Sequence, residues 1–143
     1  WSSDVCSSDL DICKMFSKGH RKPLLGVEKN NHGHAVLQEL TEHIQYPNVY
    51  YYKKGEPGWL TTSLTRPIMV NDGIEAIESD FVQIKSKETF REMLTLINNN
   101  GKIEAAKGKH DDCVMATFIA IQLVMETANK IKDYKNIKGA ILV

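Results

Sequence analysis

The spacing of apolar residues along the chain predicts helices that alternate with short strands. Apolar residues three and four positions apart share one face of a helix, and short apolar or alternating runs beside proline, glycine or asparagine are typical of strands. We therefore expect helices at residues 35–44, 67–78, 86–98 and 111–131, and strands at residues 23–28, 49–52, 81–84 and 102–106. Gly73 is expected to weaken the second helix. The alternation predicts an α/β fold, with helices packed on the faces of one mixed sheet.

Composition narrows the class of protein. The 143 residues suit one domain, and 42% hydrophobic content with zero formal net charge argues against a disordered chain. The apolar stretch 114–125 is shorter than the roughly 20 residues of a membrane span, and the three cysteines form no CxxC pair. Neutral charge excludes a strongly basic nucleic-acid coat protein, but not an enzyme that touches nucleic acid locally.

The first ten residues, WSSDVCSSDL, differ from the rest of the chain. They have no apolar periodicity, contain four serines, and resemble the translation of sequencing-adapter DNA. We expect a disordered polar tail that belongs outside the fold, which leaves residues 11–143 as a partial domain whose native N-terminus is missing. Without Asp4 and Asp9, these 133 residues contain 18 basic and 16 acidic side chains, so the formal charge becomes +2.

Two groups of acidic residues could take part in catalysis. Glu28 ends the first predicted strand, and His110, Asp111 and Asp112 precede the last predicted helix. Carboxylates held at a strand end and at a helix start can point to one place, and hard divalent cations prefer such oxygen ligands. Two such ions can activate water and stabilise the leaving oxygen in phosphodiester cleavage.

Each acidic feature also has an ordinary explanation. Glu28 could be a surface carboxylate at a strand end, and Asp111 and Asp112 could cap the helix, a role worth about 1 kcal/mol. Taken alone, these explanations are the more frequent ones. Spacing does not decide between them, because the two features lie far apart in the sequence.

Other signals are weaker. His32, His34, His110 and Cys113 have spacings that fit no strong zinc motif, and Cys113 is expected to be a small buried residue. Tyr50–Tyr52 could stack on bases, but alternation into and out of a sheet is the more common arrangement. The sequence has no glycine-rich phosphate loop, so nucleotide hydrolysis is not supported.

Three blocks of sequence, in order and spacing, carry a family resemblance. They are LLGVEKNNHGHAVLQEL, YPNVYYYKKGEPGWLTTSLTRPIMV and GKIEAAKGKHDDCVMATFIAI, and they cover most of residues 24–128. Their most specific parts are VEKNNHG, the GW-T-T pattern with Arg66 downstream, and GKHDD-VMA. These blocks resemble the nuclease domain of tailed-phage terminase large subunits. The resemblance implies a ribonuclease-H-like fold, cutting of concatemeric viral DNA during genome packaging, and a packaging ATPase in full-length members.

The resemblance also assigns roles to residues. The second acidic metal ligand of the family falls on Glu28, and the last falls on Asp111, with Asp112 as the accessory or alternative. His110 would support these ligands or contact phosphate, and the ion would be Mg²⁺ or Mn²⁺. No residue matches the aspartate that the family carries on its first strand, since Asp11 lies too close to Glu28. We therefore expect this fragment to lack one ligand, the opening hairpin and the ATPase, and to be inactive by itself.

Partners follow from the same resemblance. It implies double-stranded DNA, the portal protein and the terminase small subunit, no membrane, and a location in the host cytoplasm with transient binding at the procapsid portal. Asn30 and Asn31 are candidates for contact with the DNA backbone, but they could also orient Glu28 or form a turn. Local side chains rather than net charge would contact DNA, with Lys107 and Lys109 favoured. The candidates are Lys29, Asn30, Asn31, Lys53, Lys54, Arg66, Lys107 and Lys109.

Two other functions remain open from the sequence. Another ribonuclease-H-like nuclease, such as a Holliday-junction resolvase, would prefer branched DNA and form a dimer. A DNA-binding or assembly module without catalysis would hold Glu28 and Asp111 far apart and bind no divalent ion. A nuclease would bring the two carboxylates together at one sheet edge, within reach of a shared ion.

Overall fold

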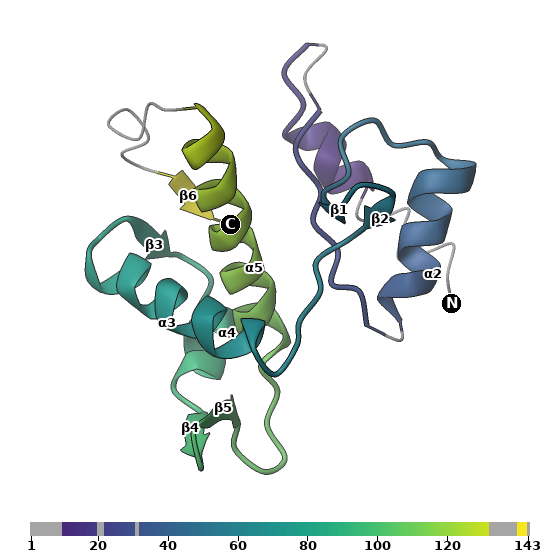
Figure 1. The fold of residues 1–143 in the computed structure, drawn as a ribbon. Coiled ribbons are helices and arrows are strands. Elements are labelled where there is room, and N and C mark those ends of the chain that lie inside the picture. The colour runs from purple at the N-terminus through teal and green to yellow at the C-terminus, as the bar shows by residue number, and fades with distance from the viewer. Residues whose placement is uncertain (1–9, 20–21, 31, 132–139, 143) are drawn as a thin grey trace. The chain divides into compact units, whose positions relative to one another are not determined.

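The computed structural model describes residues 10–19, 22–30, 32–131 and 140–142, and over these residues the chain is mixed α/β (Figure 1). The chain divides into two compact units, Trp1–Thr61 and Thr62–Val143. Residues 1–9 lie outside the described part. Leu10 is helical and packs on a buried cluster, so the structure differs from the expected tail at this residue.

The first unit combines short helices with a small hairpin. Residues 10–15 are helical, α2 spans Gly33–Gln38, and the π-helical turn η1 continues it over Glu39–His43. The predicted single helix at residues 35–44 is therefore an α-helix followed by a π turn. Leu37, Leu40 and Val49 form the buried cluster of this unit. The antiparallel pair β1 (Tyr51–Lys53) and β2 (Glu56–Pro57) follows.

The expected strand at residues 23–28 is not a regular strand. Leu25 and Glu28 form isolated parallel bridges, with Val49 and Trp59 respectively. The Leu25 N–H donates to Asn48, while the Val27 carbonyl accepts from the Trp59 N–H at 2.7 Å. Because this short segment changes its pairing partner halfway, it builds no continuous ladder with either one.

Two packed helices organise the second unit. Helix α3 spans Thr65–Glu78 and α5 spans Asp112–Ile131, and their buried residues include Met69, Val70, Val114, Phe118 and Ile121. A Cβ added to Gly73 would lie 2.2 Å from Cδ1 of Phe118. The expectation that Gly73 only weakens α3 is therefore incomplete, because the missing side chain lets the two helices approach closely. None of the helices in the described part of the chain is long and apolar enough to cross a membrane.

The expected helix at residues 86–98 is wrong in its second half. Helix α4 spans Lys87–Met93, begins where Ser86 Oγ accepts the Thr89 N–H at 3.2 Å, and ends before β4 (Leu96–Asn99). Strand β4 pairs with β5 (Lys102–Ala105), so the connection is the dipeptide Asn100-Gly101. Both residues have positive φ, 52° and 87°. This geometry is the one that a two-residue hairpin turn of type I′ requires, and Asn-Gly is its favoured sequence.

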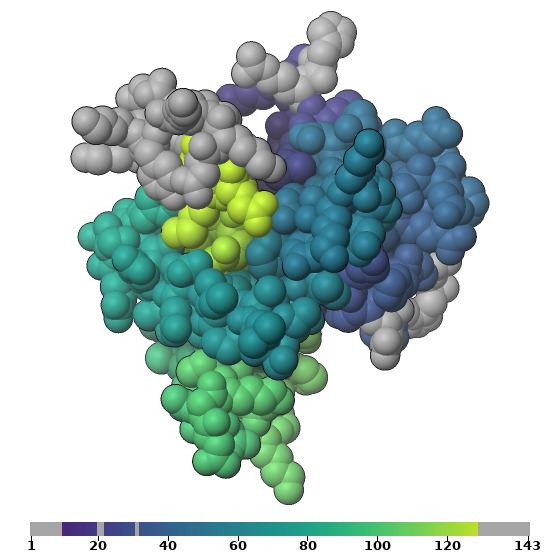
Figure 2. Space-filling model, viewed as in Figure 1, coloured from purple at the N-terminus to yellow at the C-terminus, as the bar shows by residue number. Residues whose placement is uncertain are grey.

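The described strands form three separate two-stranded sheets. Two of them, β1–β2 and β4–β5, are antiparallel, and the third pairs β3 (Val82–Ile84) with β6 (Ala140–Leu142) in parallel. The single mixed sheet expected from the sequence is thus not formed by the described strands, each of which is only two to four residues long. In Figure 2 the green segment that contains β4 and β5 protrudes from the second unit.

Candidate functional site

Hydrogen bonds fix the backbone on both sides of Glu28. Glu28 bridges Trp59, and the Lys29 N–H donates to the Trp59 carbonyl at 2.6 Å. A Cβ on Gly33 would lie 1.8 Å from the Glu28 carbonyl oxygen, so no side chain fits there. Gly33, the glycine of VEKNNHG, therefore allows helix α2 to begin in direct contact with the backbone of Glu28.

Asn30 holds the Glu28 side chain. Its Nδ2 donates to Glu28 Oε2 at 3.1 Å, and its Oδ1 accepts the Gly33 N–H at 2.8 Å. The two bonds orient the amide and give the carboxylate a defined neighbour, which is one of the two roles considered for this residue. Lys29 Nζ lies 3.5 Å from Glu56 Oε2. Asn31, the other asparagine candidate, lies outside the described residues.

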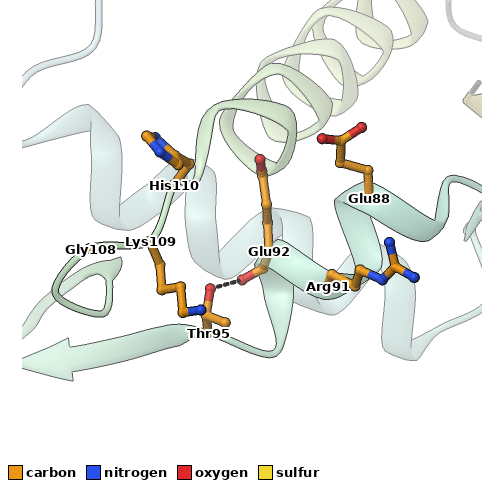
Figure 3. A pocket seen from close by; sticks show the side chains of 7 residues that line it. All are labelled: Glu88, Arg91, Glu92, Thr95, Gly108, Lys109 and His110. Carbon is orange, nitrogen blue, oxygen red and sulfur yellow. Dashed lines mark hydrogen bonds between the residues drawn. The ribbon is translucent and has the colours of Figure 1, made fainter.

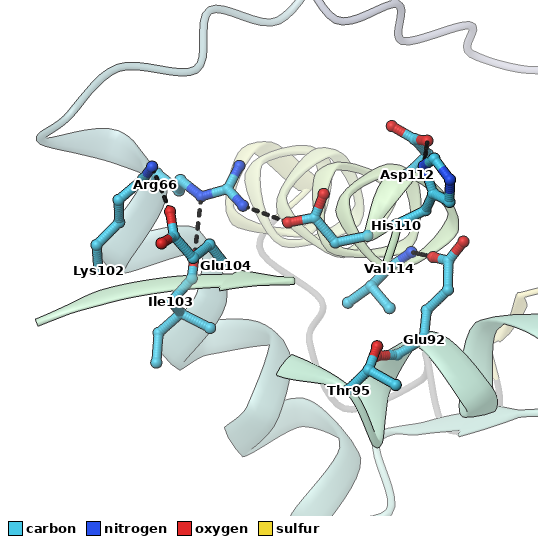
Figure 4. A network of polar contacts seen from close by, with 10 residues as sticks. Arg66, Glu92, Thr95, Lys102, Ile103, Glu104, His110, Asp112 and Val114 are labelled. Atoms are coloured by element: carbon cyan, nitrogen blue, oxygen red, sulfur yellow. Dashed lines mark hydrogen bonds and ion pairs between the residues drawn. The ribbon is translucent and has the colours of Figure 1, made fainter. Parts of the chain in front are cut away.

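In the second unit, Arg66 pairs with Asp111. Arg66 Nη2 donates to Asp111 Oδ2 at 2.6 Å, and Nε donates to the Ile103 carbonyl at 3.2 Å (Figure 4). Each side chain of the pair is 22% exposed. The sequence assigns Arg66 to DNA, whereas the structure gives its guanidinium two protein acceptors. Because Arg66 lies in the first turn of α3 and Ile103 lies in β5, the pair ties the start of α5 to both elements.

The two aspartates at the start of α5 differ in environment. Asp112 is 89% exposed, and its carboxylate lies 3.8 Å from the ring of His110, which is also highly exposed. Asp112 is the first residue of α5, where a negative charge interacts favourably with the positive end of the helix dipole. The geometry thus makes Asp111 a carboxylate held by a protein donor and Asp112 a solvated one.

Glu92 caps α5 from another element, a contact that the sequence analysis missed. Its Oε2 accepts the Val114 N–H at 3.1 Å. Burial and the nearby Glu92 carboxylate raise the pKa of the Cys113 thiol. Cys113 is half-buried, so the expectation of a small buried residue holds only in part. On β5, the hydrogen bonds of Lys102 and Asn99 lower the pKa of Glu104, and the charge of Arg66 adds a smaller effect.

The turn before α5 borders an open pocket of about 370 Å³ (Figure 3). The expected turn at residues 107–109 is present, because the Lys109 N–H donates to the Ala106 carbonyl at 2.9 Å and Gly108 has φ of +76°. Lys107 and Lys109 are both exposed. Acidic and basic groups lie together on the pocket wall, which consists of Glu88, Arg91, Glu92, Thr95, Gly108, Lys109 and His110.

In the described part of the chain, residue types that bind metals are present, but they do not form a cluster. Carboxylate oxygens suit hard divalent cations. Among the residues that the structure describes, however, no group of three histidine, cysteine, aspartate or glutamate side chains could hold an ion. Glu28 and Asp111 lie in different units, each with its own protein donor.

The three tyrosines do not alternate as expected. Tyr50 is buried, with its ring centroid 5.9 Å from that of Trp59, but Tyr51 and Tyr52 are both exposed. The register of β1 with β2 shifts between Tyr51 and Lys53. This irregularity breaks the two-residue period that alternation needs.

Comparison of the chain with protein-family models and with curated proteins finds no match. The function therefore has to be argued from the chain itself. Within the first unit, the first block of sequence contacts the second through Glu28 and Trp59. Within the second unit, the second block contacts the third through Arg66 and Asp111.

Proposed function

We propose that the chain is part of the endonuclease domain of a phage terminase large subunit, with a ribonuclease-H-like fold, which cuts concatemeric viral DNA during genome packaging. The Arg66–Asp111 ion pair carries this proposal. Its two residues are 45 positions apart, and the resemblance singles out both, one from the GW-T-T block and one from GKHDD. If the two motifs matched the family only by chance, there would be no reason to expect Arg66 and Asp111 to be in contact.

Fixed carboxylates also support the proposal. Asn30 orients Glu28, and Arg66 orients Asp111 while compensating its charge. Groups that bind reacting atoms work best when other residues lock their side chains in place. Lys107 and Lys109, in the turn before Asp111, are the cations proposed to contact the DNA backbone.

Mg²⁺ or Mn²⁺ is the proposed cofactor, and such an ion would supply an activated water and stabilise the leaving oxygen. The described residues do not by themselves form a site for it. The ion is therefore assigned to the complete gene product, with the additional aspartate that the resemblance places upstream.

Plasmid cleavage by the complete gene product tests the proposal. We expect cleavage to require Mg²⁺ or Mn²⁺ and to be lost in Glu28→Gln and in Asp111→Asn, while circular dichroism stays unchanged. The amide in each variant keeps the size of the side chain and an oxygen that accepts from Asn30 or Arg66. Unchanged circular dichroism would show that the fold survives the lost charge, so that loss of cleavage reports on the site. Asp80→Asn, at a turn after α3, is the matched control and should cleave normally.

Two results would reject the proposal. Cleavage by both variants at the wild-type rate would remove Glu28 and Asp111 from the chemistry and favour a binding or assembly module. Cleavage of a four-way junction in strong preference to linear duplex would favour a junction resolvase instead.

A further inference from the structure

The β1–β2 hairpin presents two neighbouring aromatic rings to solvent. Tyr51 is 48% exposed and Tyr52 is 38% exposed. In a regular strand one of two successive side chains would face inward. Here the shifted register of β1 leaves both outside, so two large rings lie uncovered on three residues of strand.

Two lysines follow these rings in the hairpin. Lys53 and Lys54 are exposed, and Lys53 Nζ lies 5.4 Å from the centroid of the Tyr52 ring. The nearby Glu56 carboxylate lies within ion-pair distance of Lys29, which offsets its negative charge. The hairpin surface made of Tyr51, Tyr52, Lys53 and Lys54 is therefore aromatic and positively charged.

We propose that this hairpin surface binds single-stranded DNA, with bases stacked on Tyr51 and Tyr52 and phosphates paired with Lys53 and Lys54. Aromatic rings beside basic groups are the combination that binds unpaired strands without sequence preference. A duplex buries its base faces by stacking, so it can use the lysines but not the rings. The choice of DNA rather than RNA rests on the proposed function. Binding of an unpaired strand by the hairpin surface does not itself require that the protein cleaves DNA.

Fluorescence anisotropy with fluorescein-labelled (dT)15 and the full chain, without divalent ions, tests the tyrosines. We expect Tyr51→Ala and Tyr52→Ala each to weaken binding by about 5- to 100-fold, the range of one base stacked on an aromatic ring. Tyr51→Phe and Tyr52→Phe keep the rings and should bind within about twofold of wild type. Phe90→Ala is the matched control, because Phe90 is 56% exposed and belongs to the other unit, and it should not change binding.

Salt dependence tests the lysines. Lys53→Gln and Lys54→Gln should each reduce the slope of log K against log salt concentration by about 0.7, the value for one phosphate contact on a single strand. Lys87→Gln, at an exposed lysine of α4, should leave the slope unchanged.

Three outcomes would overturn the proposal. They are a labelled 15-base-pair duplex that binds as tightly as (dT)15, Tyr→Ala variants that bind like wild type, and (rU)15 binding that exceeds (dT)15 binding. None of these measurements involves cleavage, so a protein that fails as a nuclease could still bind single-stranded DNA through the hairpin surface.

Discussion

Arg66 and Asp111 form a charge pair that is mostly removed from solvent. Removing one partner of such a pair leaves the other charge poorly compensated, which costs more than the pair itself contributes. Arg66 also bonds the Ile103 carbonyl, so its loss would leave two acceptors without this donor. The pair is therefore a stability element of the second unit as well as part of the proposed site.

Arg66→Ala should lower the free energy of unfolding by about 1.5–3 kcal/mol, the range for hydrogen bonds that involve charged groups. Urea denaturation of the full chain measures this change. The double variant Arg66→Ala, Asp111→Ala should lose less than the sum of the two single variants, because they remove the same interaction. Additive losses would mean that the two residues are not coupled.

His43 should respond to pH through its ion pair with Glu39, in which the ring Nδ1 lies 2.6 Å from the carboxylate. Its hydrogen bond to Glu39 raises the pKa of His43 above the ordinary 6.5. The contribution of this pair to stability is complete below pH 6.5 and is lost as pH rises through the raised pKa. An NMR titration of the ring protons should show this midpoint, and Glu39→Gln should bring it back toward 6.5; equal midpoints would contradict the pairing.

The sequence indicates candidate site residues, but it does not indicate which residues they contact. Glu28 and Asp111 follow from the motifs, and an orienting role for Asn30 follows from its closeness to Glu28 in the chain. The partners Arg66–Asp111 and Glu92–Val114 join residues 45 and 22 positions apart. Such contacts depend on how whole elements pack, which local patterns do not encode.

At the scale of elements, Gly73 shows how packing overrides helix propensity. Glycine inside a helix is normally less stable than alanine by roughly 0.5–1 kcal/mol. Here the alanine methyl would collide with Phe118, which is fully buried on α5. The glycine is thus required by the contact between α3 and α5.

Gly73→Ala should therefore destabilise the chain, by about 1–3 kcal/mol as for other overpacked cores, instead of stabilising it. Thermal or urea denaturation gives the sign. In a Phe118→Leu background, where the ring is gone, the same substitution should cost less. Stabilisation by Gly73→Ala in the wild-type background would show that the two helices are not in close contact at this point.

The β4–β5 hairpin shows where periodicity misleads. Phe90, Leu94 and Ile97 have helical spacing, yet they are 56%, 71% and 45% exposed, so they do not form a buried stripe. Asn100-Gly101 was the better signal, because few dipeptides tolerate two successive positive φ angles. The helix at 67–78 and the long helix from residue 111 were confirmed to within two residues, since their apolar faces pack on each other.

Over the whole molecule, the mixture of helices and strands is confirmed, but the single mixed sheet that the sequence predicts is not formed by the described strands. Strands two to four residues long gain little from their own hydrogen bonds. Two of the three pairs, β1–β2 and β4–β5, are local hairpins, whereas β3 pairs with the distant β6, and nothing in the local pattern indicates that pairing. The second block of sequence runs through the end of one unit and the beginning of the next. Its residues contact the first block in one unit and the third block in the other.

We propose that Glu28 and Asp111 serve one catalytic function. The most direct measurement is a double-variant cycle in the cleavage rate of the complete gene product with Mg²⁺, using Glu28→Gln, Asp111→Asn and both together. Residues that act as one unit give grossly non-additive losses, so the double variant should be no slower than the worse single variant. Rates that fall by the product of two independent effects, or single variants as fast as wild type, would contradict the account.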